Sequence, residues 1–309
     1  MKFPLTPPIL PQLAISAERL PEGDGWCYEP KLDGFRAIVF VDGDERLIQS
    51  RNGRPLDRYF PEVETPGVRC ILDGELVVLD GHGKEDFGAL QQRIHPAASR
   101  IARLAAETPA RFVPFDLLAD GERSLLDDPF AARRERLAAL LEPIEATGSV
   151  SDAERWLAWR EGVVAKRLDA GYLPGKRANM VKVKRMRTID CVVIGWRESS
   201  AGGSVGSLVL GLYERDGDIR HVGHAAGFTA KRARELVAMV TPLATGAVHE
   251  PEPSRWSRRE AAWRQLRPEL VCEVMIDHVS DGRIRHGGRF QRWRDDKRPE
   301  ECNVDQLDQ

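Results

Sequence analysis

The 309-residue sequence has few cysteines and no long apolar run. Its five cysteines are far apart, odd in number and form no C-x-x-C pair, so neither a zinc site nor a disulfide framework is expected. No stretch approaches the roughly 18 apolar residues of a membrane-spanning helix, and the proline-rich start lacks the apolar core of a signal peptide. We therefore expect a cytoplasmic protein.

The sequence also lacks an excess of charge of either sign, since 46 Lys and Arg oppose 48 Asp and Glu to give a net charge of −2. This balance excludes a histone-like protein whose bulk charge binds polyanions, so any nucleic-acid contact has to be local. The proportions of charged and hydrophobic residues, 30% and 42%, are ordinary for a globular protein. The length exceeds what one core usually fills, which favours two domains.

Short β-type runs alternate with turns in the first part of the chain, and helical patterns lie among them. Strands are expected at residues 34–41, 46–50, 70–79, 111–118, 162–167 and 180–184, and helices at 88–107, 129–141 and 152–160. Residues up to about Ala14 contain several prolines and are expected to be extended without forming an element. This pattern predicts an α+β domain of antiparallel sheets with helices, residues 1–187.

The pattern changes after Arg187. Expected strands at residues 189–196, 207–213, 219–224 and 271–279 are regularly spaced, and one helix at 229–240 interrupts them. Several short strands with a single internal helix fit a small β-barrel of the OB-fold type. We therefore predict an OB-fold domain, residues 188–309.

The most informative stretch is Glu29-Pro30-Lys31-Leu32-Asp33-Gly34-Phe35-Arg36. It places a lysine amine, a tight Asp-Gly turn and an arginine suited to phosphate or ribose within a few residues. Lysine becomes nucleophilic only when burial or neighbouring cations favour its neutral form. By itself the K-x-D-G pattern is a weak signal, because a solvated lysine before a turn is the commoner explanation.

Six further motifs follow Lys31–Gly34 along the chain. They are Ser50-Arg51-Asn52-Gly53, Asp73-Gly74-Glu75, Phe115-Asp116-Leu117-Leu118, Glu161-Gly162-Val163-Val164, Lys182-Val183-Lys184 and Arg294-Asp295-Asp296-Lys297. In this order the motifs resemble those of the ATP-dependent polynucleotide ligases, a branch of the nucleotidyltransferases that also include the mRNA capping enzymes. The resemblance covers nearly the whole chain, from Glu29 to Lys297, and implies an adenylation domain followed by the OB-fold barrel.

The resemblance implies that Lys31 attacks the α-phosphate of ATP, expels pyrophosphate and carries AMP. The AMP then passes to a 5′-phosphate, and the adjacent 3′-hydroxyl attacks it with release of AMP. Lys182 and Lys184 alternate on a strand, so both point to one face. There they suit catalytic phosphate contacts and favour the neutral form of Lys31.

Carboxylates repel phosphates unless a divalent cation lies between them, so Mg²⁺ is implied as a cofactor beside ATP, with Mn²⁺ as a second candidate. Glu161 is expected to be a metal ligand, and Glu75 a ribose or metal contact. Further contacts are implied for Glu29 with the adenine amino group, Phe115 with the adenine face, Arg36 and Arg51 with AMP or the DNA 5′-phosphate, and Arg294 and Lys297 with pyrophosphate when the barrel closes. Without the resemblance, Phe115 is simply a core residue.

Basic residues concentrate in residues 176–187 and 283–298, where only Asp295 and Asp296 oppose them. We interpret both runs as contacts for a DNA backbone. The resemblance thus favours a minimal bacterial DNA ligase of repair and end joining, acting as a nucleoid-associated monomer on duplex DNA with nicks or ends. Polymerase or end-binding repair proteins are the implied partners. Because Lys31 lies only about thirty residues from the start, we expect no additional N-terminal DNA-binding domain.

Two alternatives stay open at this point. An RNA ligase or a capping guanylyltransferase would share the chemistry, although capping uses GTP. A non-catalytic nucleic-acid-binding module would lack catalytic positions, whereas Lys31, Glu75, Glu161, Lys182 and Lys184 are all present. The sequence does not distinguish nicks from double-strand ends, and it does not define the tolerance for ribonucleotides or the preferred metal.

Overall fold

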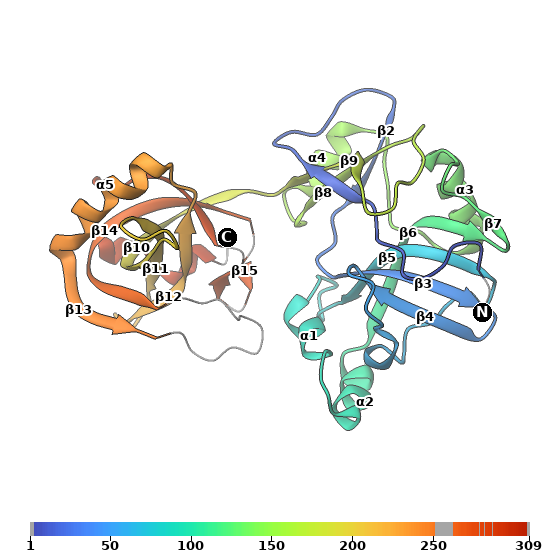
Figure 1. Cartoon of the computed structure of the whole chain (residues 1–309), viewed down its shortest axis with the longest axis horizontal. Coiled ribbons are helices and arrows are strands. Elements are labelled where there is room, and N and C mark those ends of the chain that lie inside the picture. Colours follow the sequence, from blue (N-terminus) through green and yellow to red (C-terminus); the bar gives the residue numbers. More distant parts are fainter. Residues whose placement is uncertain (1–2, 251–261, 278, 281, 286, 308–309) are drawn as a thin grey trace. The chain divides into compact units, whose positions relative to one another are not determined.

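The computed structural model describes residues 3–250, 262–277, 279–280, 282–285 and 287–307. The chain divides into two units, Met1–Arg185 and Met186–Gln309, and each has its own buried core (Figure 1). The strands of the first unit are β1 (Leu13–Ser16), β2 (Trp26–Pro30), β3 (Phe35–Asp42), β4 (Glu45–Ser50), β5 (Cys70–Val78), β6 (Ala110–Asp120), β7 (Arg123–Ser124), β8 (Gly162–Arg167) and β9 (Arg177–Lys184). Its helices are α1 (Phe87–Gln92), α2 (Ala98–Glu107), α3 (Phe130–Leu140) and α4 (Val150–Trp156), with a short 3₁₀ turn at Asp57–Tyr59.

A five-stranded antiparallel sheet, in the order β4-β3-β5-β6-β7, is buried on both faces. In β3 the side chains of Ala37, Val39 and Val41 enter one core, while Ile38 and Phe40 enter another. This split follows from the two-residue period of a strand, which sends alternate side chains to opposite faces. Helix α1 packs against β5 and helix α3 against β6 (Figure 1).

A second sheet, in the order β1-β9-β8-β2, carries the later motifs of the first unit. Val163, Ala165 and Val183 pack with Tyr28 in a core beneath the sheet, and Ala153 of α4 completes it. Since neighbouring residues of a strand face opposite ways, Lys182 and Lys184 lie on the face of β9 opposite to Val183. The apolar residue between the two lysines therefore fixes which way both lysines point.

Two local expectations for the first unit were wrong. Residues 13–16 do form an element, the strand β1, which pairs in parallel with β9 and makes this second sheet mixed. Residues 88–107 form two helices instead of one, because Pro96 lies between α1 and α2. Proline lacks the amide hydrogen that an uninterrupted helix needs, and its ring clashes with the preceding turn.

The second unit is a closed barrel in which β10 (Arg187–Glu198), β11 (Val205–Tyr213), β12 (Ile219–Ala226), β17 (Gly288–Trp293) and β14 (Trp263–Ile276) follow one another, and β14 pairs back with β10. All pairings are antiparallel except β12 with β17. Its other elements are α5 (Ala230–Val240), β13 (Ala244–His249), β15 (Val279–Ser280), β16 (Arg283–Ile284) and 3₁₀ turns at Thr241–Leu243, Pro299–Glu301 and Val304–Leu307.

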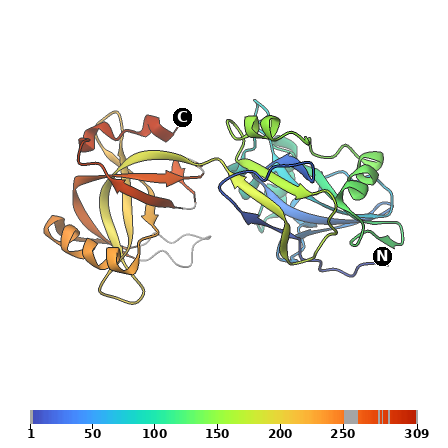
Figure 2. The same ribbon diagram turned by 90° about the horizontal axis from the view of Figure 1, so that it is seen from above.

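Helix α5 lies on the outside of the barrel strands, as Figure 2 shows for this unit. Its side chains Leu236 and Val240 belong to the same core as the apolar residues of the barrel. Five barrel strands with one helix inserted after the third confirm the predicted α+β domain followed by an OB fold. Within the described part of the chain, no helix is both long and apolar enough to cross a membrane.

A buried ion pair in the first unit generates a stability prediction. Arg133 of α3 donates to both carboxylate oxygens of Asp116 in β6, at 2.7 and 2.9 Å, and both side chains are almost completely buried. Arg133→Met would leave the Asp116 charge without its partner, so we expect a loss of about 3–5 kcal/mol in the free energy of unfolding of the first unit. Urea denaturation followed by circular dichroism measures this loss.

Arg136→Met is the matched control, because Arg136 lies on the same helix and pairs with Asp120 at 3.2 Å in an exposed position. An exposed pair contributes about 0–1 kcal/mol, so this variant should unfold close to the wild type. Equal losses in the two variants would contradict the importance given to burial of the Asp116 pair.

Candidate active site

Lys31 lies directly after β2, where the chain meets the start of β8. Its backbone N–H donates to the carbonyl of Gly162 at 2.9 Å, and its Nζ contacts Oε2 of Glu161. Gly162 is required here, because a Cβ at this position would lie 2.3 Å from the carbonyl oxygen of Val183 in β9. The K-x-D-G and E-G-V-V motifs, 130 residues apart in sequence, are thus joined through backbone and side chain.

Glu161 lies between two lysines. Its Oε1 lies 3.4 Å from Nζ of Lys184, and its side chain is only 6% exposed. Burial lowers the pKa of Lys182, and the neighbouring cations Lys184, Lys31, Arg177 and Arg51 lower it further. Arg51 itself lies in the exposed turn after β4. The structure therefore gathers the nucleophile candidate and three further predicted phosphate contacts, Lys182, Lys184 and Arg51, in one place.

Glu75 in β5 joins the same group of charges. Burial raises the pKa of its carboxyl group to about 7, with further raising by Asp73 and Glu161, while Arg36 and Lys31 oppose the shift. Close packing of β3 on β5 requires Gly34, because a Cβ there would lie 2.2 Å from the carbonyl oxygen of Leu76. Because the charge of Glu161 contributes to the raised pKa of Glu75, these two carboxylates are close enough to interact.

The carboxylates of Glu75 and Glu161 suit a magnesium ion whose remaining ligands are phosphate oxygens. Mg²⁺ binds hard oxygen ligands and usually takes one or two carboxylates together with substrate phosphates. Among the described residues, no three His, Cys, Asp or Glu side chains gather as a metal site made by protein alone. Glu161 and Glu75 could hold Mg²⁺ only as part of a site that ATP shares.

Arg36 is held by the aspartate of the D-G-E motif. Its Nε and Nη2 donate to the two oxygens of Asp73 at 2.5 and 2.6 Å, and Nη2 also donates to the carbonyl of Gln12 at 3.3 Å. Tyr172 donates its hydroxyl to Asp73 at 2.6 Å. The guanidinium carbon lies 4.5 Å from the ring centroid of Phe115. Gln12 and Tyr172 were not among the predicted site residues, since no local sequence pattern distinguishes them.

Glu29 is almost completely buried at 2% exposure, and two cations hold its carboxylate. Arg134 donates to Oε1 at 2.8 Å, and Nζ of Lys166 lies 2.7 Å from Oε2. Burial raises the pKa of Glu29, and these two cations oppose the shift. Lys166 also donates to the carbonyl of Phe115 at 3.0 Å and lies 4.4 Å from the centroid of its ring. Lys166 therefore connects the two residues expected at the adenine.

Lys166 was not among the predicted site residues, although one feature of the sequence points to it. It is the single charged residue in the apolar strand Gly162–Arg167 before the terminal arginine. A lysine in a buried strand requires a partner, because an unpaired buried charge is costly. Its partner Glu29 is 137 residues earlier in the chain, so the sequence alone did not identify the pair.

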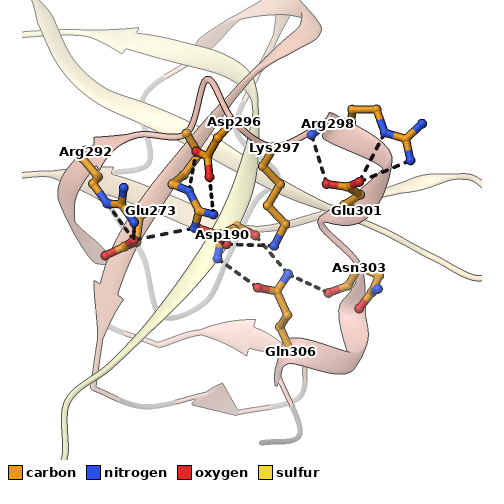
Figure 3. Close-up of polar contacts among 10 residues, drawn as sticks. Asp190, Glu273, Arg292, Asp296, Lys297, Arg298, Glu301, Asn303 and Gln306 are labelled. Atoms are coloured by element: carbon orange, nitrogen blue, oxygen red, sulfur yellow. Dashed lines mark hydrogen bonds and ion pairs between the residues drawn. The ribbon is translucent and has the colours of Figure 1, made fainter.

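Arg294 and Lys297 lie in the second unit, and both contact Asp190 of β10 (Figure 3). Their basic neighbours also have acidic partners, since Arg292 pairs with Glu273 at 2.8 Å and Arg298 with Glu301 at 3.3 Å. In sequence only Asp295 and Asp296 opposed this basic run. Folding adds the carboxylates of Asp190, Glu273 and Glu301, so the surface is less positive than the sequence indicated.

Comparisons with known proteins identify the family. The family model described as "ATP dependent DNA ligase domain" matches residues 11–184, and that of the "ATP dependent DNA ligase C terminal region" matches residues 201–297. DNA ligase C1 of Mycolicibacterium smegmatis is 48% identical over 100% of this chain and 96% of its own length. The chain belongs to the ATP-dependent DNA ligases. DNA ligase C of Mycobacterium tuberculosis is 40% identical with the same coverage.

Solved ligase structures agree with this assignment. The ligase domain of M. tuberculosis LigD is 29% identical and matches 95% of this chain and 97% of its own, with a TM-score of 0.53. A mycobacterial DNA ligase D complexed with ATP and MES is 30% identical over 98% of this chain and 99% of its own, with a TM-score of 0.52. The predicted family, fold class and activity are confirmed: this is a DNA ligase that uses ATP. The RNA-ligase, capping and non-catalytic alternatives are not favoured.

The raised pKa of Glu75 generates a prediction for stability as a function of pH. The folded chain holds this proton more tightly than an unfolded glutamate does, so the free energy of unfolding falls as the pH rises toward about 7. Glu75→Gln removes the cost of ionisation. We expect this variant to melt several degrees above the wild type at about pH 8, with a much smaller gain at about pH 5.

Differential scanning calorimetry of the variant and the wild type at the two pH values measures both gains in the melting temperature of the first unit. Glu142→Gln, a change at an exposed glutamate of the same unit, is the control and should melt like the wild type throughout. A gain for Glu75→Gln that is larger at the acidic pH would show that ionisation of Glu75 does not carry the effect.

Proposed function

We propose that Lys31 is the residue that attacks ATP and carries AMP. The contact of its amine with Glu161, beside Lys182 and Lys184, is the observation that carries this proposal. An amine placed among groups that suit phosphate can attack the α-phosphorus of ATP directly and form a covalent intermediate. The same cations offset the negative charge on the phosphate oxygens during displacement of pyrophosphate.

The surrounding residues are assigned in the same proposal. Glu161 and Glu75 hold Mg²⁺ (or Mn²⁺), which when bound neutralises charge on the phosphate oxygens of ATP. Phe115 and Glu29 form the adenine side of the site, and their shared contact with Lys166 supports their placing in one subsite. Arg36 and Arg51 contact AMP or the 5′-phosphate, and Arg294 and Lys297 contact the pyrophosphate part of ATP.

The proposed substrate is duplex DNA carrying a nick or an end with a 5′-phosphate and a 3′-hydroxyl. Residues 1–187 serve as the adenylation domain and residues 188–309 as the OB-fold domain, a boundary two residues after the division of the structure at Arg185. The "Multifunctional non-homologous end joining protein LigD" of Mycolicibacterium smegmatis is 34% identical over 89% of this chain but only 37% of its own length. That likeness supports a role in end joining, with a polymerase or an end-binding protein as partner. The ligase itself is proposed to be a monomer.

Lys31→Ala should abolish self-adenylation. The purified protein is incubated with α-labelled ATP and Mg²⁺, and the covalent label is measured after denaturing electrophoresis. Alanine removes the attacking nitrogen, so we expect loss of at least about a thousandfold, in line with removal of other covalent nucleophiles. Lys231→Ala, at a highly exposed lysine of α5, is the control and should label normally. Retention of label by Lys31→Ala would refute the assignment.

Sealing assays test the proposed substrate separately. Nicked DNA, nicked RNA and a nicked DNA–RNA hybrid are each supplied with ATP or GTP, and joined strands are quantified. We expect nicked DNA with ATP to be joined fastest, because the family match is to DNA ligases over both units. Normal self-adenylation combined with a preference for nicked RNA would leave the nucleophile assignment intact and overturn the substrate.

A further inference from the structure

One carboxylate, that of Asp190, holds both cations of the last motif. Figure 3 shows its contact with Lys297. Nη1 of Arg294 donates to its two oxygens at 2.9 and 2.8 Å, and Nζ of Lys297 donates to Oδ2 at 2.8 Å. The side chain of Asp190 is only 12% exposed. The two residues proposed for pyrophosphate therefore already share an anionic partner in the protein.

The backbone of Asp190 is anchored within a barrel strand and by a neighbouring side chain. It lies in β10, whose ladder with β14 pairs Asp190 with Glu273. Its backbone N–H donates to Oε1 of Gln306 at 3.0 Å, and Nε2 of Gln306 donates to its carbonyl at 3.1 Å (Figure 3). Arg294 and Lys297 belong to a turn after β17. The backbone N–H of Arg294 donates to the carbonyl of Val271 in β14 at 2.9 Å, so a change of partner moves the long side chains of Arg294 and Lys297 and leaves the short side chain of Asp190 in place.

The donors of Arg294 are almost fully engaged. Its Nε and Nη2 donate to Asp296 at 2.8 and 2.9 Å, and its Nη1 donates to Asp190. Asp296 is two residues away and travels with Arg294, whereas Asp190 is 104 residues away on a barrel strand. Carboxylate and phosphate oxygens bind the same guanidinium N–H groups. A phosphate can therefore gain direct contact most readily by replacing Asp190.

We propose that Asp190 is a positioning residue that occupies Arg294 and Lys297 until the polyphosphate of ATP replaces it. This inference rests on the proposed function of the two cations in binding pyrophosphate. No covalent bond changes in the exchange, since contacts to one carboxylate are replaced by contacts to phosphate oxygens. Releasing the two cations from Asp190 costs free energy only when ATP binds for the adenylation of Lys31. Sealing of DNA that already carries AMP needs no ATP and is not affected.

The test compares Asp190→Asn with the wild type in two reactions. Asparagine keeps the shape of the side chain and removes its charge, so the cations are held less tightly. We expect the KM for ATP in self-adenylation to fall about tenfold, the effect of one charged hydrogen bond, with kcat changed by less than about twofold. Sealing of a pre-adenylated nick without ATP should keep its rate. An unchanged or raised KM would overturn the proposal.

Two control variants separate this effect from a general change of charge. Glu273→Gln removes a carboxylate 3.8 Å from Arg294 that mainly holds Arg292, so its KM for ATP should stay near the wild-type value. Asp190→Glu retains the anion and should restore most of the wild-type KM. A fall in KM for Glu273→Gln equal to that for Asp190→Asn would also overturn the specific role of Asp190.

Arg294→Ala and Lys297→Ala distinguish failure of this inference from failure of the proposed function. If either raises the KM for ATP while Asp190→Asn does not lower it, only the inference fails. If neither variant affects adenylation, the proposed role of the two cations in binding pyrophosphate is wrong, and the inference about Asp190 is wrong with it. If Asp190→Asn melts well below the wild type, its KM cannot be interpreted, and Gln306→Ala serves as the test variant instead. This change removes the hydrogen bonds that hold the backbone of Asp190 and keeps the charge of its side chain. A lower KM in Gln306→Ala supports the proposal, and an unchanged or higher one overturns it.

Discussion

The cationic side chains of the candidate site need acidic partners within the protein, because the protein has to fold before any phosphate binds. Lys31 and Lys184 contact Glu161, and Arg36 lies in a two-pronged contact with Asp73. A partly buried charge without a partner destabilises the folded state, so these carboxylates are needed for the site to exist. The acidic residues of the motifs thus stabilise the folded site in addition to the roles proposed for them.

The pairing depends on strand register. Gly162 lies opposite Lys184 and Val164 opposite Lys182 in the β8 and β9 ladder, so Glu161, the residue directly before β8, reaches the lysine face of β9. A slip of one residue would send Lys182 and Lys184 into the core that Val183 occupies. The apolar packing beneath this sheet therefore fixes the positions of the charged groups above it, and the chemistry depends on Val163 and Val183 as much as on the lysines.

Sequence patterns predicted the parts of the fold that depend on local chemistry. Alternating apolar residues located the main strands, and the order of motifs located Lys31, Glu161 and Lys184, which the structure brings together. The single helix expected at residues 88–107 was wrong because the apolar spacing continued across Pro96, and the steric effect of the proline overrode it. Long-range partners were not predictable, since nothing local links Lys166 to Glu29.

Ion pairs within the protein also explain why a protein that acts on a polyanion has a balanced net charge. Basic runs that look unopposed in sequence acquire acidic partners from distant strands, as Arg294 does from Asp190 and Arg292 from Glu273. Binding of phosphate at such a place is an exchange, so its free energy is the difference between two sets of contacts. A group that exchanges partners binds less tightly than an unopposed cation would. Pyrophosphate and AMP must both leave during one sealing cycle, and groups with an internal partner favour that release.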